Sequence, residues 1–201
     1  MWPELAVVVP EERAVGVRQA RPVPFLEVVT RTFGGRPEGL ARCRASLECL
    51  QSKDWTQTLV VDRARAGVAK ANRALAEHDA GGRWVWVLDD DDVCTAPMLV
   101  DWLERVAERE QPDVIVVQVR WLGRLLPPEG MWRARPQMGA ITSPSVVVRG
   151  DVWDAYRSGW REVYEGDYWF IDGLWQAGLR WSWLPLLAAQ VDRANHGAAE
   201  G

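Results

Sequence analysis

One short segment constrains the fold of this chain more than any other. The apolar run Trp84–Leu88 leads directly into four consecutive aspartates, Asp89–Asp92. A continuous apolar run of this length is typical of a strand buried on both faces of a parallel sheet. In such sheets, ligands bind outside the carboxyl ends of the strands. The segment therefore predicts an α/β fold with an acidic cluster at the ligand-binding edge of its sheet.

Strand and helix patterns alternate along the chain at a spacing that suits right-handed crossovers. The expected strands are Phe25–Thr30, Thr58–Val61, Trp84–Leu88, Val114–Val119, Ser145–Val148 and Trp181–Leu184. The expected helices are one that begins near Pro37, then Gly67–His78, Pro97–Arg109, Asp151–Tyr156 and Asp167–Gln176. In the third of these helices, Leu99, Trp102, Leu103 and Val106 are expected to face inward. The pattern predicts a single α/β domain whose mixed, mainly parallel central sheet is flanked by helices.

The regular pattern also indicates the boundaries of the domain. Residues 1–24 are rich in Val, Arg and Pro, and we expect an N-terminal extension or an edge hairpin there. Residues 25–191 form the predicted domain, which is regular over 25–120 and less regular over 121–191. Residues 192–201 are expected to form a polar C-terminal tail.

Composition excludes some classes of function. The 201 residues carry a formal net charge of −4, which gives no support for a broad nucleic-acid-binding face. The cysteines are an odd set without a CxxC pair, which argues against a disulfide framework or a structural zinc site. The sequence shows neither a signal peptide nor the ~18–20 apolar residues in a row that a membrane span needs. We therefore expect a soluble, cytoplasmic protein.

The acidic run is expected to have chemistry of its own. Adjacent carboxylates repel one another and raise each other's pKa unless a cation compensates. Oxygen ligands select hard cations such as Mg²⁺ or Mn²⁺, which bridge to substrate phosphates. Asp89 and Asp91 form a natural pair, because alternate residues of an extended segment point the same way. The alternative is a solvated acidic turn in which Asp92 or Thr95 caps the next helix.

The first part of the domain resembles a known family. The resemblance lies in the helix start Arg36–Leu40, the strand Leu59–Asp62 and the segment Trp86–Asp92. On these residues the chain is similar to the nucleotide-binding half of the family 2 inverting glycosyltransferases, which have the GT-A fold. The resemblance implies a GT-A domain in which residues 25–120 bind a nucleotide-sugar and residues 121–191 bind an acceptor.

The resemblance also implies roles for individual residues. The acidic run corresponds to the family's Asp-x-Asp element, so Asp91 is implied as a metal ligand and Asp89 as a contact to ribose or metal. The loop after the second strand, 62–67, is shorter than in the family, and residues on the following helix either compensate by reaching the ribose or diphosphate or serve as helix surface. The residues expected to contact the donor nucleotide are Thr30, Arg31, Thr32, Asp62, Lys70, Asn72, Asp89 and Asp90.

A second match lies in the acceptor half. Glu165-Gly166-Asp167 is similar to the acidic segment that supplies the family's catalytic base, although the family more often has adjacent Glu and Asp. Asp167 is therefore the candidate base that deprotonates an acceptor hydroxyl. Its alternative role is a first-turn acid favoured by the helix dipole. His196, in the tail, either completes the metal shell, as in some GT-A enzymes, or is solvated.

Trp169, Trp175 and Thr142 are the residues expected to contact the sugar or the acceptor, although both tryptophans could equally bury their helix. Together these features predict a glycosyltransferase that uses Mn²⁺ or Mg²⁺. The resemblance favours a UDP-sugar donor and transfer with inversion to a hydroxyl on a glycan, a protein or a modified base. The alternatives are a non-catalytic nucleotide- or glycan-binding module and a sugar-phosphate nucleotidyltransferase.

Overall fold

The computed structural model describes residues 23–32, 34–61 and 68–191, without the side chains of residues 68–71. The strands are β1 (Leu26–Thr32), β2 (Trp55–Val61), β3 (Trp84–Val87), β4 (Val93–Cys94), β5 (Val114–Trp121), β6 (Arg124–Leu126), β7 (Val146–Arg149) and β8 (Trp181–Val191). The helices are α1 (Pro37–Leu47), α2 (Val68–Ala76), α3 (Leu99–Glu110), α4 (Gly150–Tyr156) and α5 (Gly166–Gln176). Every expected strand and helix has a counterpart. The expectations for residues 1–22 and 192–201 lie outside the described residues.

The strands of the described residues form one sheet in the order β2-β1-β3-β7-β5-β8-β4, with β6 paired to β5. Strands β1 and β2, β1 and β3, and β5 and β8 pair in parallel, whereas the other four pairings are antiparallel. The sheet is therefore mixed, as expected, but it is not clearly mainly parallel. After β5 the chain stays at the carboxyl edge, through β6 and the 3₁₀ turn Ser143–Ser145. Strand β7 then runs backward, because no crossover helix precedes it.

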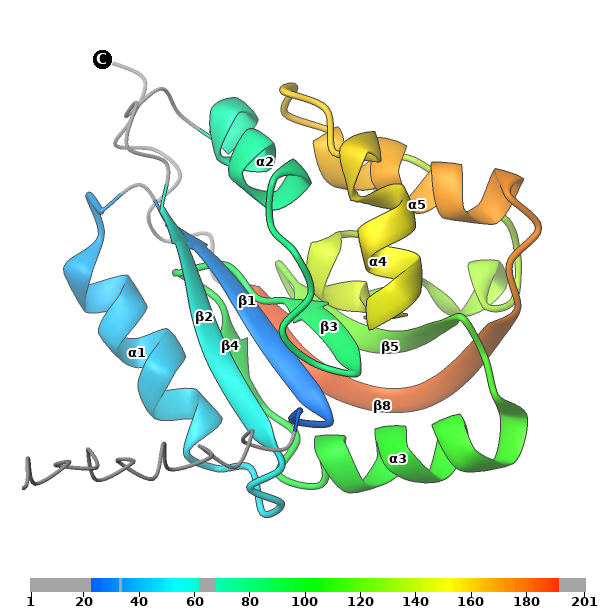
Figure 1. The fold of residues 1–201 in the computed structure, drawn as a ribbon, viewed down its shortest axis with the longest axis horizontal. Helices are drawn as coiled ribbons and strands as arrows, with labels where there is room; N and C mark the ends of the chain where they lie inside the picture. Colours follow the sequence, from blue (N-terminus) through cyan, green and yellow to red (C-terminus); the bar gives the residue numbers. More distant parts are fainter. Residues whose placement is uncertain (1–22, 33, 62–67, 192–201) are drawn as a thin grey trace, which may run out of the picture.

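Helices cover both faces of this sheet (Figure 1). One hydrophobic cluster packs α1 and α3 against one face, and a second packs α2, α4 and α5 against the other. Strand β3 belongs to both clusters, because Trp84 and Trp86 point into the first and Val85 and Val87 into the second. The double burial expected for this strand is confirmed. None of the described helices is long and apolar enough to cross a membrane.

Helix α3 differs from its expected inner face at one position. Leu99, Val100, Leu103 and Val106 are buried, whereas Trp102 is 41% exposed. The buried stripe of α3 therefore includes Val100, and Trp102 lies at its exposed edge. There the Arg105 guanidinium lies 5.1 Å from the Trp102 ring centroid.

Candidate functional site

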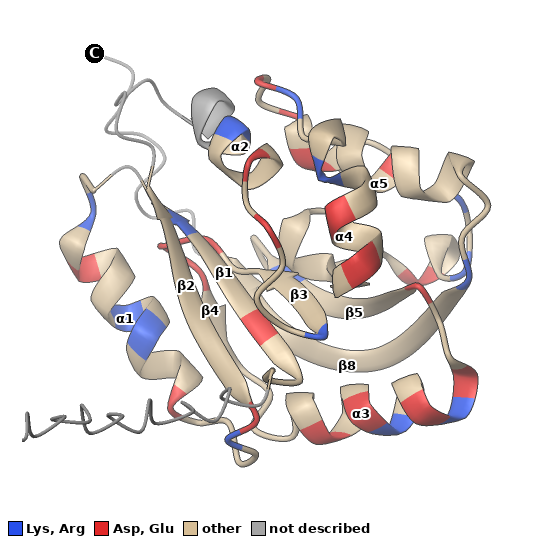
Figure 2. Ribbon diagram, in the orientation of Figure 1, with Lys and Arg blue, Asp and Glu red and all other residues tan. Residues whose placement is uncertain are grey.

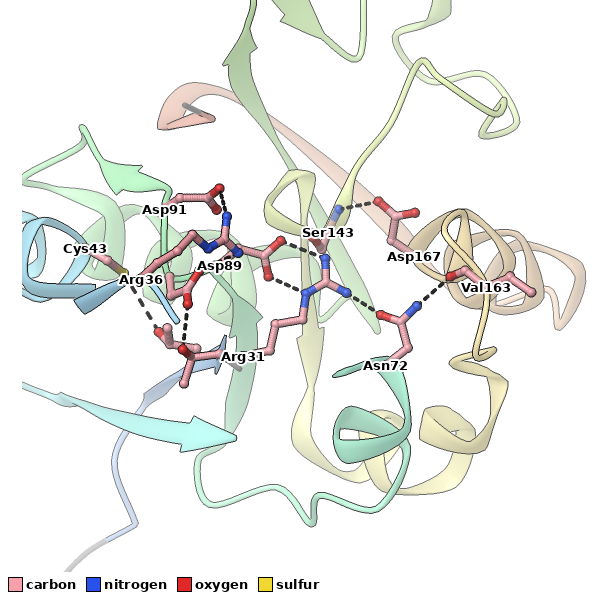
Figure 3. Close-up of polar contacts among 12 residues, drawn as sticks. Arg31, Arg36, Cys43, Asn72, Asp89, Asp91, Ser143, Val163 and Asp167 are labelled. Atoms are coloured by element: carbon pink, nitrogen blue, oxygen red, sulfur yellow. Dashed lines mark hydrogen bonds and ion pairs between the residues drawn. The ribbon is translucent and has the colours of Figure 1, made fainter. Parts of the chain in front are cut away.

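A cavity of about 330 Å³ lies beside the carboxyl ends of β1 and β3, the edge where ligands bind in α/β sheets. The first half of the domain contributes five charged residues to its lining: Arg31, Arg36, Asp89, Asp91 and Asp92. The second half contributes mainly Ile141, Thr142, Ser143, Tyr164, Glu165, Asp167 and Tyr168. Figure 3 shows Asp89 and Asp167 on different sides of the Arg31 guanidinium. The two predicted halves of the domain therefore meet at one cavity.

Arg31, near the end of β1, holds the first aspartate of the run. Its Nε and Nη2 donate to the two carboxylate oxygens of Asp89 at 2.5 and 2.7 Å. Burial alone would lower the pKa of Arg31, but the Asp89 carboxylate more than offsets this and raises it above its usual range. A two-pronged ion pair of this kind fixes the orientation of both side chains. Arg31 is therefore a permanent positive charge at the cavity.

Arg36 pairs with the middle of the run. It lies just before α1 and binds Asp90 through Nη2 at 2.8 Å and Asp91 through Nη1. The Thr32 hydroxyl donates to the second oxygen of Asp90 at 2.6 Å. Helix α1 approaches the run closely at Gly39, where a Cβ would lie only 2.9 Å from the Asp90 backbone oxygen. The amino end of this helix therefore lies beside the carboxylates, where its dipole favours negative charge.

The acidic run is not a solvated turn. Asp90, Asp91 and Asp92 are 0%, 3% and 1% exposed. Neither proposed cap serves the next helix, because the residue that precedes α3 is Met98 and the Thr95 hydroxyl instead donates to the backbone oxygen of Leu187. Both expectations of the alternative interpretation are therefore wrong.

Asp92 is the least compensated carboxylate of the run. It lines the cavity, and its buried Oδ1 has no hydrogen-bond partner among the described residues. Burial and the neighbouring charges of Asp89 and Asp91 raise its pKa well above the usual value. Burial also raises the pKa of Asp90. The run would therefore gain from additional positive charge.

Asp167 lies in the first turn of α5 and lines the cavity. Its carboxylate accepts hydrogen bonds from the backbone N–H groups of Tyr168 at 2.7 Å and Ser143 at 3.3 Å. Burial raises the pKa of Asp167, although the charge of Arg31 acts in the opposite direction. A carboxylate with a raised pKa is a stronger base. Asp167 is therefore a first-turn acid of α5 and a cavity-lining residue at the same time.

Some expected contact residues lie away from the cavity. Thr30 is fully buried, and its hydroxyl accepts a hydrogen bond from Gln57 at 3.0 Å. The Trp169 ring lies 4.2 Å from the Arg161 guanidinium, and Trp175 packs edge-on against Trp181. None of these three residues lines the cavity, and the contact roles expected for both tryptophans stay predictions.

Other expected site residues are only partly described. Asp62 and His196 lie outside the described residues, and Lys70 is described only as part of the α2 backbone. Thr142 does line the cavity, next to the 3₁₀ turn Ser143–Ser145. Asn72 is buried and makes its contacts within the protein.

Sequence analysis missed Arg36, Asp92, Tyr164 and Tyr168 as lining residues. The sequence did contain a feature that could have identified Arg36, because this residue directly precedes the proline that begins α1. Asp92 could have been identified as the fourth carboxylate of the run. The two tyrosines flank the candidate base, but nothing in the spacing separates them from the tryptophans that were preferred.

The carboxylates of the acidic run are oxygen ligands of the kind that a hard divalent cation prefers, although several of these oxygens already have partners. Arg31 occupies both oxygens of Asp89, and Arg36 binds one oxygen of Asp91. No cluster of three or more metal-ligating His, Cys, Asp or Glu side chains is found in the described part of the chain. The unpartnered Oδ1 of buried Asp92 is the atom that calls for a cation. Asp91 and Asp92, which both line the cavity, are therefore the residues that would hold a cation there.

Comparisons with known proteins identify the fold. No protein-family model matches the sequence, and no curated protein matches it either. Among solved structures, the chain is similar to S. aureus TarS, a GT-A-like glycosyltransferase. The TarS 1–349 structure matches with a TM-score of 0.62 at 14% identity. Its complexes with UDP and with UDP-GlcNAc match with TM-scores of 0.61 and 0.58, at 16% and 13% identity.

These matches cover 83% of this chain but 58–60% of TarS 1–349. The chain therefore spans less than two thirds of the structures that it matches. At this identity the likeness concerns the fold, and it places the present chain among proteins with a glycosyltransferase fold.

Proposed function

We propose that this protein is a metal-dependent, family 2-like inverting glycosyltransferase that transfers a sugar from a nucleoside diphosphate donor to a hydroxyl acceptor. One observation carries the proposal. A single cavity contains two guanidiniums and an acidic run on its first-half side, and the carboxylate of Asp167 on its second-half side. Cationic groups suit a diphosphate, and a carboxylate with a raised pKa suits a general base. The arrangement supports a reaction between these two sides.

In the proposed reaction, Asp167 accepts the proton of the acceptor hydroxyl, and the acceptor oxygen forms a bond to the anomeric carbon from the face opposite the diphosphate. The bond between that carbon and the diphosphate oxygen breaks, and the diphosphate leaves with the electron pair. Arg31 and Arg36 both line the cavity, and we propose that they stabilise the charge that develops there. A bound Mn²⁺ or Mg²⁺ would neutralise further charge on the diphosphate. We propose Asp91 and Asp92 as its contacts, with Asp89 and His196 as further ligands.

The donor is proposed to be a UDP-sugar. The fold neighbours include complexes of TarS with UDP and with UDP-GlcNAc, which supports a uridine nucleotide as the first ligand to examine. The group that we propose is transferred from this donor is a hexosyl unit. Thr142, Tyr164 and Tyr168 line the cavity from the second half, and we propose them as contacts to the sugar or the acceptor.

The test is a calorimetric titration of the protein with UDP and with GDP, first with Mn²⁺ and then with EDTA. We expect binding of UDP that requires the metal and is lost in Asp91→Ala. Glu108→Ala, which removes an exposed acid from α3, is the matched control and should bind normally. If the metal changes the affinity of neither nucleotide, the proposal fails. If UDP binds with metal but UDP-sugars are never turned over, the protein is a nucleotide-binding module.

A further inference from the structure

Asn72, on helix α2, connects two parts of the molecule that lie far apart in the sequence. Its side chain is fully buried. Its Nδ2 donates to the backbone oxygens of Arg161 at 2.9 Å and Val163 at 2.8 Å, and its Oδ1 accepts a hydrogen bond from Nη1 of Arg31. A side-chain amide has two N–H donors, and both are used here. Asn72 is therefore committed to the protein itself, not to a nucleotide.

Arg31 extends this connection to the acidic run. One edge of its guanidinium holds both oxygens of Asp89, while Nη1 holds Asn72 (Figure 3). A guanidinium is planar and its donors are fixed in direction, so the two contacts are geometrically linked. The result is a continuous chain of hydrogen bonds from Asp89 through Arg31 and Asn72 to the backbone of residues 161–163.

Gly166 shows how closely Asn72 fits against this segment. A Cβ at position 166 would lie 2.2 Å from Nδ2 of Asn72 and 2.4 Å from the backbone oxygen of Arg161. No side chain fits in that space, because such distances are far below van der Waals contact. The amide of Asn72 therefore occupies the volume that any larger residue at 166 would need. Gly166 immediately precedes the candidate base, Asp167, and is the first residue of α5.

We propose that Asn72 is a positioning residue that fixes the segment 161–166 and thereby holds the Asp167 carboxylate opposite Asp89. This inference rests on the proposed function, because it gives Asp167 its role as base. Asn72 touches neither substrate nor reacting atoms in this scheme. It acts through Gly166 and through the backbone of residues 161 and 163. Gly166, which stands where the family more often has Glu, is then a packing requirement.

The alternative is that Asn72 only stabilises the fold, as any buried amide with satisfied hydrogen bonds does. The two roles predict different kinetics. A residue that only stabilises the fold would leave the rate constant of the folded enzyme unchanged. A positioning residue lowers kcat without changing the affinity for UDP, because the donor contacts at Asp89 and Arg36 remain in place.

Two substitutions separate these roles. Asn72→Asp keeps the size of the side chain and its pairing with Arg31, but it removes both N–H donors that hold residues 161 and 163. Gly166→Ala disrupts the same contact from the α5 side, because the added methyl group displaces the side-chain amide of Asn72. Gly173→Ala is the matched control, because Gly173 lies in the same helix and an added Cβ there would have nothing within 4 Å.

We expect Asn72→Asp and Gly166→Ala to lower kcat for UDP-sugar turnover about 10- to 100-fold, with unchanged UDP affinity by calorimetry. Gly173→Ala should match the parent protein. The proposal is overturned if UDP affinity and kcat fall together, or if neither variant differs from Gly173→Ala. Melting temperatures of all variants are recorded, so that kinetics are compared only where each protein is folded.

A second measurement needs no substrate. Hydrogen exchange of the amides in residues 161–168 should accelerate about tenfold or more in Asn72→Asp and Gly166→Ala, relative to the β-sheet core. Asp89→Asn should loosen the same segment, and its effect should be non-additive with Asn72→Asp, because both break one hydrogen-bonded chain. Unchanged exchange would refute the positioning role. If the parent protein neither binds UDP nor turns over UDP-sugars, the proposed function fails while the exchange result still decides whether Asn72 holds the segment.

Discussion

The two ends of the sheet both contain buried carboxylates, but these differ in how well hydrogen bonds and positive charges compensate them. In Figure 2 strand β1 carries one acidic and one basic band, which its sequence identifies as Glu27 and Arg31. Glu27, near the amino end of β1, is 1% exposed and fully satisfied. It accepts hydrogen bonds from the Thr58 hydroxyl at 2.5 Å and the Gly81 N–H at 2.5 Å, and it pairs with His78 at 3.1 Å.

The pKa values of these carboxylates shift in opposite directions. Burial alone would raise the pKa of Glu27, but its hydrogen bonds and His78 more than offset this and lower it. At the carboxyl end, burial raises the pKa of Asp90 and Asp92, and Oδ1 of Asp92 has no partner among the described residues. Equal burial thus leaves a carboxylate satisfied where its hydrogen bonds are complete, and short of compensating charge where they are not. The comparison predicts that substitutions at the two ends change different properties.

The largest effect is expected at the carboxyl end, in catalysis. Asp167→Asn should lower sugar transfer about 10²- to 10⁴-fold, because the amide cannot accept the acceptor's proton. UDP affinity, measured by calorimetry, should stay the same. Glu162→Gln, at an exposed acid a few residues earlier, is the control and should transfer sugar normally. Full activity of Asp167→Asn would mean that another group is the base.

How far the sequence predicts this arrangement depends on the range of the interactions involved. Strand β3 and the acidic run were predictable, because a buried strand and its terminal charges are local features. The direction of β7 was not, since it depends on where the chain lies after β5. The pairing of Arg36 with Asp90 and Asp91, and the contact between Asn72 and Gly166, join residues that only the tertiary fold brings together. The motif that contains Asp167 is local, so its place at the cavity could be predicted, whereas Tyr164 could not be distinguished from Trp169 by spacing.

A smaller effect is expected at the amino end, in stability. Glu27→Gln should lower the free energy of unfolding by about 2 kcal/mol at neutral pH, because it removes charge-assisted hydrogen bonds, and should leave UDP affinity unchanged. The folded pKa of Glu27 lies below its ordinary value of 4.5, so its contribution is fully present above 4.5 and is lost as the pH falls through the folded pKa. The difference between parent and Glu27→Gln in chemical denaturation should therefore shrink on acidification. A difference that stays constant with pH would contradict the assignment.

The smallest effect has the opposite sign and tests the comparison most directly. Asp92→Asn removes a buried charge that lacks a partner at Oδ1, so it should raise the free energy of unfolding by about 1 kcal/mol in metal-free buffer. Added Mn²⁺ should raise the melting temperature of the parent protein, since it supplies the missing positive charge, but should do so much less in Asp92→Asn. The same substitution at a satisfied carboxylate, Glu27→Gln, destabilises. If Asp92→Asn also destabilises and leaves the response to Mn²⁺ intact, the carboxylate is a structural element, and the contrast between the two ends of the sheet disappears.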